Sequence, residues 1–284
     1  MGGRRSWRRP GRREGPLYER RAAMKTLVLL HGLASNSTRW WHFMAHTRLG
    51  QDWKVLRPEL RGHAGSSDRG RIGMREWCDD VAALLDREGC RRAVIGGHCL
   101  GANIALNFAA RYPERTAALV LIEPMPPEAL TGTMKRLSVL RPLVRGLAQL
   151  ARLLNALGIR RHRLQPMDLE AWDRAVREGK TRIARYASPL SDLRTTPVVA
   201  YLQSLAAVGE RLPALSEIGA PALVLLSANS AMTDPARTRA AIERLRDVTI
   251  VTLDAEHWIP TEQPEAMRAA IEEWLIRQAL ETAA

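Results

Sequence analysis

A cysteine stands at the centre of the segment 97–101, Gly-His-Cys-Leu-Gly, which has glycine at both ends. An apolar run at 93–95 precedes this segment and apolar residues at helical spacing follow it, which predicts a sharp turn from a strand into a helix. Small residues at Gly97 and Gly101 avoid a clash in such a turn. The turn would lift the Cys99 side chain out of the sheet and place it at a helix N-terminus, whose partial positive charge favours the reactive thiolate.

Short β-branched or leucine-rich runs alternate with amphipathic stretches along the chain, the pattern of parallel strands joined by crossover helices. The predicted strands lie at 27–30, 54–57, 93–95, 118–122, 222–226 and 248–253. The predicted helices lie near 74–88, 100–112, 235–246 and 264–280. We therefore expect an α/β fold with a doubly wound, mostly parallel sheet.

The alternation stops between 126 and 213, where helix and turn signals occur without a buried-strand run. Because the pattern resumes afterwards, we expect an inserted helical cap over the carboxyl edge of the sheet, where ligands bind in open α/β sheets. A chain of 284 residues can bury one sizeable core. The predicted organisation is thus a core formed by 24–125 and 214–284, with a cap at 126–213.

The predicted cap carries an amphipathic pattern with apolar residues at steps of three and four: Leu137, Leu140, Val144, Leu147, Leu150, Leu154 and Leu157. Three arginines, Arg141, Arg145 and Arg152, fall on the other side. The segment 135–163 contains eight basic residues and no acidic one. We interpret it as an amphipathic helix with a solvated basic face; the alternative is a docking surface for an anionic substrate or carrier.

The formal net charge of +13 is concentrated near the N-terminus, where 1–23 holds eight arginines and two glutamates. This Arg-, Gly- and Pro-rich composition predicts a disordered arm. The arm is either a tail for nucleic acid or a membrane surface, or an extension ahead of a start at Met24. We favour the extension, because the first strand begins directly after Met24. No recognition motif accompanies the charge, so no nucleic-acid partner is expected.

The three cysteines, Cys78, Cys90 and Cys99, make an odd number without ligand-like spacing. This number and spacing suggest neither a disulfide framework nor a zinc site, and a reducing cytoplasm fits them best. The apolar runs are far shorter than the roughly 20 residues that span a bilayer, so no stable membrane insertion is expected. Without a Gly-rich phosphate loop, no nucleotide cofactor is expected, and without ligand-like spacing no metal is expected. The oligomeric state stays open.

Further motifs occur in a fixed order around the cysteine: His-Gly-Leu at 31–33, Arg-Gly-His-Ala-Gly-Ser-Ser at 61–67, and Glu-His-Trp-Ile-Pro at 256–260. Each follows a predicted strand. Together with the 97–101 turn, they make the chain from Met24 to its end resemble the α/β-hydrolase superfamily, of the capped esterase, epoxide-hydrolase and haloperoxidase-like type.

The resemblance implies a nucleophilic Cys99, in place of the usual serine, with His257 as its base and later as the acid for the leaving group. It implies an oxyanion hole formed by the backbone N–H groups of Leu33 and Leu100. His31 would orient the loop beside that hole. The family usually has an acid three or four residues after the strand 222–226, but here Ser-Ala-Asn-Ser-Ala follows at 227–231.

A known variation of the superfamily moves the acid one strand earlier, where this sequence has Glu123. A charged side chain at the end of a central strand needs a partner, and His257 is the candidate. Glu123 could instead bond backbone amides at the base of the cap. Asp234 is a second candidate acid, and a Cys–His dyad without an acid is a third possibility.

Several apolar and aromatic residues flank the motif loops and are expected to wall an apolar substrate pocket: His31, His98, Trp40, Trp41, Phe43, Met44, Met125 and Trp258. The expected partner is a small-molecule acyl substrate, anionic or carrier-linked if the basic cap face contributes. His63 is expected to be structural.

Because a thiolate leaves a tetrahedral intermediate more readily than an alkoxide or amide, activated esters, lactones and thioesters suit Cys99 as substrates. The acyl group would pass to water, or to another acceptor in an acyltransferase. A non-catalytic binding protein is the remaining alternative. Epoxide-hydrolase and dehalogenase chemistry is excluded, because both use an aspartate nucleophile.

Overall fold

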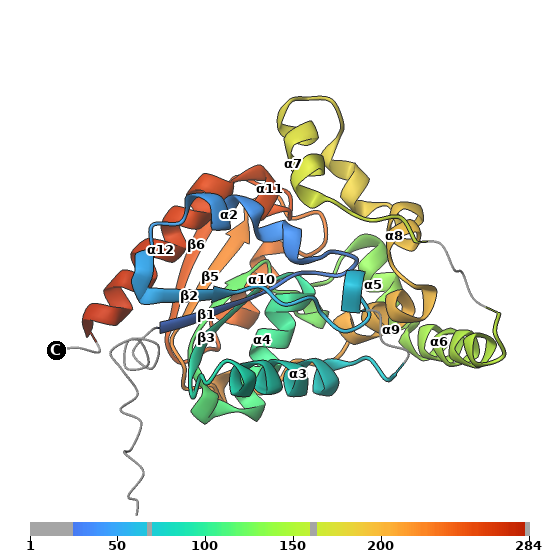
Figure 1. The fold of residues 1–284 in the computed structure, drawn as a ribbon, viewed down its shortest axis with the longest axis horizontal. Helices are drawn as coiled ribbons and strands as arrows, with labels where there is room; N and C mark the ends of the chain where they lie inside the picture. The colour runs from blue at the N-terminus through green and yellow to red at the C-terminus, as the bar shows by residue number, and fades with distance from the viewer. Residues whose placement is uncertain (1–24, 67–69, 160–163, 282–284) are drawn as a thin grey trace, which may run out of the picture.

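The structure of the chain is a computed structural model that describes residues 25–66, 70–159 and 164–281. The predicted arm at 1–23 lies outside these ranges. The described strands form one parallel sheet in the order β2-β1-β3-β4-β5-β6 (Figure 1). They are β1 (Lys25–Leu30), β2 (Trp53–Leu56), β3 (Ala93–His98), β4 (Thr116–Ile122), β5 (Ala222–Ser227) and β6 (Val248–Leu253). The predicted α/β fold with a parallel sheet is confirmed.

Helices cover both faces of the sheet. One face packs against α3 (Met74–Arg87), α4 (Leu100–Arg111) and α10 (Pro235–Ile242), and the other against α2 (Trp41–His46), α11 (Ile259–Glu262) and α12 (Pro264–Glu281). Side chains alternate along each strand. In β1, Val28 and Leu30 enter the first layer, whereas Leu27 and Leu29 enter the second.

Between β4 and β5, the described residues form helices joined by turns and loops. This insertion contains α5 (Gly132–Val139), α6 (Arg141–Ala156), α7 (Leu169–Arg177), α8 (Pro189–Thr195) and α9 (Val198–Val208). Helix α9 joins the insertion to the core, because Ala200, Ala207 and Val208 belong to the main apolar cluster. Figure 1 shows α5 to α9 beyond the end of the sheet where β3 runs into α4.

The predicted leucine-rich helix is two helices, α5 and α6, which meet at Leu140. Only part of the apolar side of α6 is buried. Val144 and Ala148 are buried, but Leu147 is 45% exposed and Leu150 is 51% exposed. The reason is that α6 packs on α9 through its smaller side chains, so the leucines face solvent. No helix within the described ranges has the length and apolar character needed to cross a membrane.

Candidate active site

Cys99 lies in the turn between β3 and α4, with φ of 56°. A Cβ atom on Gly97 would lie 2.3 Å from the backbone carbon of Gly101, and one on Gly101 would lie 2.3 Å from the carbonyl oxygen of Leu30. Neither approach is sterically possible, so the turn requires glycine at both positions. The Cys99 N–H donates to the Ile122 carbonyl at 2.9 Å, which ties the turn to the end of β4.

The two candidate oxyanion donors flank this turn. A Cβ on Gly32 would lie 3.3 Å from the Cβ of Cys99, so the 31–33 loop passes directly beside the thiol. Leu33 lines the cavity next to Cys99. Leu100 is the first residue of α4, and the N–H of a first helical residue has no partner within its helix.

Glu123 and His257 form a buried pair beside Cys99. His257 Nδ1 donates to Glu123 Oε2 at 3.0 Å, and both side chains are 3% exposed. Glu123 directly follows β4 and His257 lies in the loop after β6. Like Cys99, both have positive φ, at 49° and 150°. Backbone strain of this kind persists where the surrounding structure enforces it, and it concentrates at functional sites.

Residues at the end of β5 hold Glu123 in place. The Ser227 N–H donates to Glu123 Oε1 at 2.5 Å, and the Ser230 hydroxyl donates to Oε2 at 2.9 Å. Glu123 therefore bonds both a backbone amide and His257, which combines the two predicted alternatives. Asp234 instead caps α10 by accepting from the Arg237 N–H at 3.0 Å. Glu123 is thus the carboxylate that reaches the histidine.

The groups around His257 favour the protonated form of its ring. Burial opposes a charge on His257, but hydrogen bonds with Cys99 and Glu123, together with their negative charge, raise the pKa of the ring to about 10. Burial likewise opposes the charge of Glu123, whereas bonds from His257, Ser227 and Ser230 lower the pKa of the carboxyl. At neutral pH these groups favour a charged Glu123 and a protonated His257 between the acid and the thiol.

Two further side chains fix the backbone at His257. The Glu262 carboxylate accepts from the N–H of Glu256 at 2.9 Å and from the N–H of Trp258 at 2.8 Å, so it brackets the histidine. The ring of His98 donates through Nε2 to the His257 carbonyl at 3.0 Å. Burial holds the pKa of His98 well below its usual value, so this ring is neutral.

His31 does not line the cavity, which corrects its assignment as a substrate contact. It is fully buried, and its Nε2 accepts from the Leu60 N–H at 3.0 Å while Nδ1 donates to the Gly32 carbonyl at 2.9 Å. These two bonds join the 31–33 loop to the backbone at Leu60. His63 is also fully buried and lies edge-on to His31, with ring centroids 5.2 Å apart.

Met125 lies against Cys99. Its Sδ is 3.1 Å from Cys99 Sγ, within hydrogen-bond distance of the thiol in its protonated form. Asn103 of α4 fixes the Met125 backbone twice, donating to the carbonyl at 3.0 Å and accepting from the N–H at 2.9 Å. The Met125 thioether is thereby held as a wall of the site.

A cavity of about 330 Å³ opens above Cys99 and His257. His98, Met125 and Trp258 line it, as do apolar side chains of the insertion, among them Met134, Leu137, Met167 and Leu205. Trp40 does not line it, and this prediction was wrong. Trp40 is fully buried with Phe43 beneath the sheet, because the turn that contains both directs them into that layer and leaves Arg39 facing the cavity.

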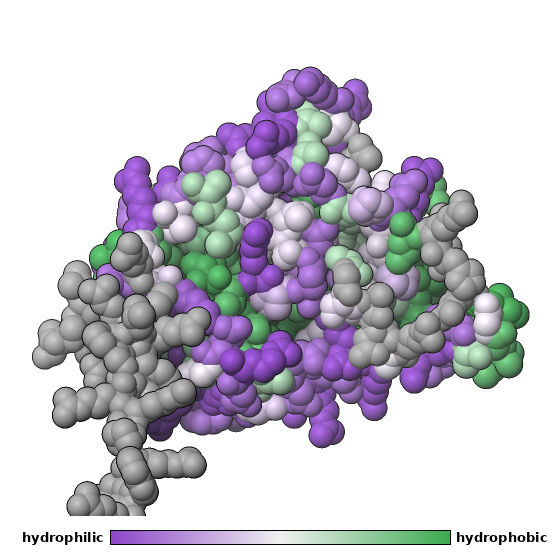
Figure 2. All heavy atoms as spheres, in the orientation of Figure 1, coloured by the Kyte–Doolittle hydropathy of each residue, from purple (hydrophilic) through white to green (hydrophobic). Residues whose placement is uncertain are grey.

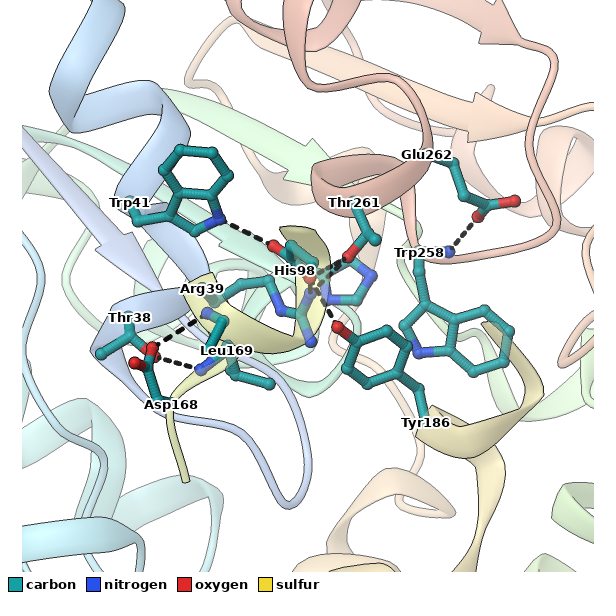
Figure 3. A network of polar contacts seen from close by, with 12 residues as sticks. Thr38, Arg39, Trp41, His98, Asp168, Leu169, Tyr186, Trp258, Thr261 and Glu262 are labelled. Carbon is teal, nitrogen blue, oxygen red and sulfur yellow. Dashed lines mark hydrogen bonds and ion pairs between the residues drawn. The ribbon is translucent and has the colours of Figure 1, made fainter. Parts of the chain in front are cut away.

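A buried ion pair joins the insertion to the core at the cavity wall (Figure 3). Arg39 donates to Asp173 of α7 at 3.1 Å and to Thr261 of α11 at 2.6 Å. Asp173 also accepts from Trp41 at 2.9 Å and from Tyr186 at 2.6 Å. Sequence reasoning missed this cluster, because Arg39 and Asp173 are 134 positions apart and neither belongs to a motif.

A model of the alpha/beta hydrolase family matches residues 27–270. Among curated relatives, lipase LipV of Mycobacterium tuberculosis is 33% identical over 110 residues, which are 39% of this chain and 40% of the lipase. This chain spans only 28% to 40% of the length of the first curated relatives that it matches.

Solved structures share the fold over most of the chain. A thermophilic esterase from Thermogutta terrifontis has a TM-score of 0.65 at 22% identity, covering 90% of this chain and 91% of the esterase. An enol-lactonase from Burkholderia xenovorans has a TM-score of 0.64 at 22% identity, covering 89% and 92%. The family model spans most of the residues from β1 to α12, and the chain therefore belongs to the alpha/beta hydrolase family.

Proposed function

We propose that the protein hydrolyses activated esters, lactones or thioesters through an acyl-thioester intermediate on Cys99. One observation carries the proposal: Cys99, His257 and Glu123 come from three separate strand ends and are all held at positive φ, with Cys99 and His257 lining one cavity and Glu123 hydrogen-bonded to His257. A strained, buried acid–histidine pair beside a cysteine is costly to maintain without a chemical use.

In the first step, the Cys99 thiolate attacks the acyl carbon and forms a carbon–sulfur bond. The electron pair of the carbonyl moves to oxygen, where the N–H groups of Leu33 and Leu100 stabilise it; donors of this kind contribute about 3 kcal/mol each. The intermediate then collapses and the bond to the leaving group breaks. Protonated His257 gives its proton to that group, and Glu123 keeps the ring oriented.

In the second step, water is the nucleophile. Once Cys99 Sγ carries the acyl group, it no longer offers the hydrogen bond and negative charge that raise the pKa of His257. The neutral ring then accepts a proton from water as the oxygen attacks the thioester carbon. The carbon–sulfur bond breaks, the thiolate is restored, and the acid product leaves. His257 thus acts as an acid in one step and a base in the next.

The composition of the cavity favours an apolar acyl group. Apolar side chains dominate its lining, and Met125 and Trp258 lie beside Cys99 and His257. A volume of about 330 Å³ suits a short acyl chain or a ring. The lipase and the enol-lactonase named above are relatives and fold neighbours whose names fit ester and lactone substrates. We propose a small acyl compound as the substrate.

The free cysteines support a reducing compartment. Cys78, Cys90 and Cys99 are all unpaired, and the mechanism requires Cys99 as a thiolate. A cytoplasmic location, where thiols stay reduced, fits this requirement.

Steady-state hydrolysis of p-nitrophenyl acetate and of a short acyl-thioester tests the proposal. We expect turnover in the wild-type protein, no measurable turnover in Cys99→Ala, and a loss of at least about 10²-fold in His257→Ala. An added alcohol or thiol that diverts the acyl group from water would identify an acyltransferase. Unchanged turnover in Cys99→Ala would reject the proposed nucleophile.

A further inference from the structure

The surface of the insertion bears a concentrated apolar patch. Of the eleven large apolar side chains that are exposed among the described residues, eight lie within 139–159. They are Val139, Leu140, Leu143, Leu147, Leu150, Leu153, Leu157 and Ile159, each 45% to 73% exposed. We call these eight residues the leucine face. Figure 2 shows apolar side chains gathered at the outer end of the molecule, where Figure 1 places α6.

Helix α6 presents three different faces. Val144 and Ala148 are buried and lie four residues apart, on the side that packs against α9. Leu143, Leu147 and Leu150 repeat at steps of four and three on the exposed side. The arginines at 141, 145 and 152 lie on the side opposite these leucines at 3.6 residues per turn. Packing on α9 therefore leaves the leucine face without a partner in the described chain.

The charge around the leucine face has one sign. Between 131 and 159 there are five basic residues, at 135, 136, 141, 145 and 152, and no acidic residue. Outside this segment, Glu210 pairs with Arg145 at 2.5 Å. An amphipathic helix with leucines on one side, arginines on the other and no acidic residue has the composition of helices that lie in the interface of anionic bilayers.

We propose that the leucine face docks reversibly onto an anionic membrane surface, with α6 lying in the headgroup region. The 16-residue helix is about 24 Å long and projects from the molecule, so a planar bilayer can receive its whole length. A second copy of this segment carries the same basic residues and no acidic residue, so it offers no opposite charge, whereas an anionic bilayer does. Docking uses no residue of the proposed acyl chemistry.

The same insertion also reaches the cavity. Met134 and Leu137 of α5 line the cavity, while Val139 at the end of that helix belongs to the leucine face. A docked α5–α6 pair therefore places the cavity wall at the bilayer.

Flotation with lipid vesicles tests the proposal on the full chain. We expect binding to vesicles of equal parts phosphatidylcholine and phosphatidylglycerol to be at least about tenfold tighter than to pure phosphatidylcholine. Each basic residue near the surface contributes roughly fivefold, so Arg136→Gln/Arg152→Gln should bind at least about tenfold more weakly, and added salt should also weaken binding.

The double variant Leu150→Gln/Leu153→Gln tests how much the apolar side chains of the leucine face contribute to binding. It should bind the anionic vesicles at least about tenfold more weakly than the wild type. Ile276→Gln is the matched control, because Ile276 is exposed to a similar 49% on α12 and should bind as the wild type does. Arg75→Gln on α3 is the control for charge. All variants should keep the wild-type hydrolysis rate with a water-soluble ester.

Three results would overturn the proposal: no binding to anionic vesicles, equal binding to neutral vesicles, or unchanged binding of the leucine variant. A dimer in solution that Leu150→Gln/Leu153→Gln converts to a monomer, without vesicle binding, would assign the face to self-association instead. Loss of esterase activity in every assay would reject the proposed chemistry while leaving the docking result intact.

Discussion

Glu123 Oε2 lies 3.0 Å from Nδ1 of His257, although β5 separates the strand that ends at the acid from the strand that precedes the histidine. The acid reaches its partner across the end of β5. Ser227 and Ser230, which follow in the segment where the family usually has its acid, donate hydrogen bonds to the relocated carboxylate. The backbone N–H of Ser227 and the hydroxyl of Ser230 thus bind the acid that replaces the missing one.

This arrangement predicts that an acid at position 230, after β5, can partly replace Glu123. We expect Glu123→Ala to lower kcat/KM roughly tenfold to hundredfold, at the low end for positioned acid–base groups, because a thiol needs less help than a hydroxyl. Glu123→Ala/Ser230→Asp should recover part of this loss, because Ser230 is already within hydrogen-bond distance of the carboxylate position. Ester hydrolysis kinetics measure both values.

Asp234→Ala is the control for this experiment. It should keep near wild-type kcat/KM and lose about 1 kcal/mol of stability, because Asp234 caps α10. A larger loss of activity in Asp234→Ala than in Glu123→Ala would assign the acid to Asp234 instead.

The His257 pair predicts a pH dependence of stability. The pKa of His257 is raised from 6.5 to about 10, so its contribution to folding is fully present below about pH 6.5 and is lost as pH rises through about 10. The lowered pKa of Glu123 has the opposite sense, and that contribution is lost as pH falls below its usual value. Urea denaturation from neutral pH to above pH 10 should show the first loss.

His257→Gln removes the titrating ring and should flatten the stability profile between neutral pH and about pH 10. If wild type and His257→Gln lose stability in parallel over that range, the raised pKa is not a property of this histidine.

The Arg39–Asp173 pair predicts that a buried polar cluster helps to hold α7 of the insertion on the core. Removing one partner of a buried pair leaves an unpaired charge and typically costs about 3–5 kcal/mol. Asp173 is 1% exposed and bonds four side chains, so Asp173→Ala should fall in that range by urea denaturation and should speed proteolysis of the insertion.

Asp168→Ala, five residues earlier, is the matched variant. Asp168 caps α7 by accepting from the Ala171 N–H, so its loss should cost about 1 kcal/mol. Equal costs at Asp168 and Asp173 would show that the buried cluster contributes nothing beyond an ordinary helix cap.

Much of the fold and the centre of the site could be predicted from sequence, because both depend on local patterns. Apolar periodicity located each strand to within a few residues, and the two glycines of the 97–101 turn are required by contacts with the adjoining backbone. Glu123 could be proposed because the family resemblance implies an acid at the end of this strand in one variation of the superfamily, and Glu123 is the first residue after the predicted strand.

Features that depend on packing between distant segments could not be predicted. Trp40 and Arg39 are adjacent, yet the direction of the turn sends Trp40 into the core and Arg39 to the cavity. The leucine row of α6 has the spacing of a packed helix, but α9 accepts only the smaller face. Glu262 and Asp173 act through partners that no local pattern identifies.

The space around each glycine predicts opposite effects on stability for Gly101→Ala in the tight turn and for Gly146→Ala in α6. Gly101→Ala would set a Cβ 2.3 Å from the Leu30 carbonyl oxygen, so the variant should be destabilised by more than about 3 kcal/mol or fail to fold. Gly146→Ala, in α6 with nothing within 4 Å, should gain about 0.5–1 kcal/mol. Thermal denaturation distinguishes them, and a stable, active Gly101→Ala would contradict the geometry of the turn.

Time-resolved intact-mass measurement with p-nitrophenyl acetate and a short acyl-thioester tests the central claim most directly. We expect a transient mass increase of one acyl group that is absent in Cys99→Ala and retained in Cys90→Ala, which keeps the reactive thiol while removing a partly exposed one. We also expect the adduct to decay at the rate of turnover. Turnover without an adduct on Cys99, or an adduct that persists while product forms, would contradict it.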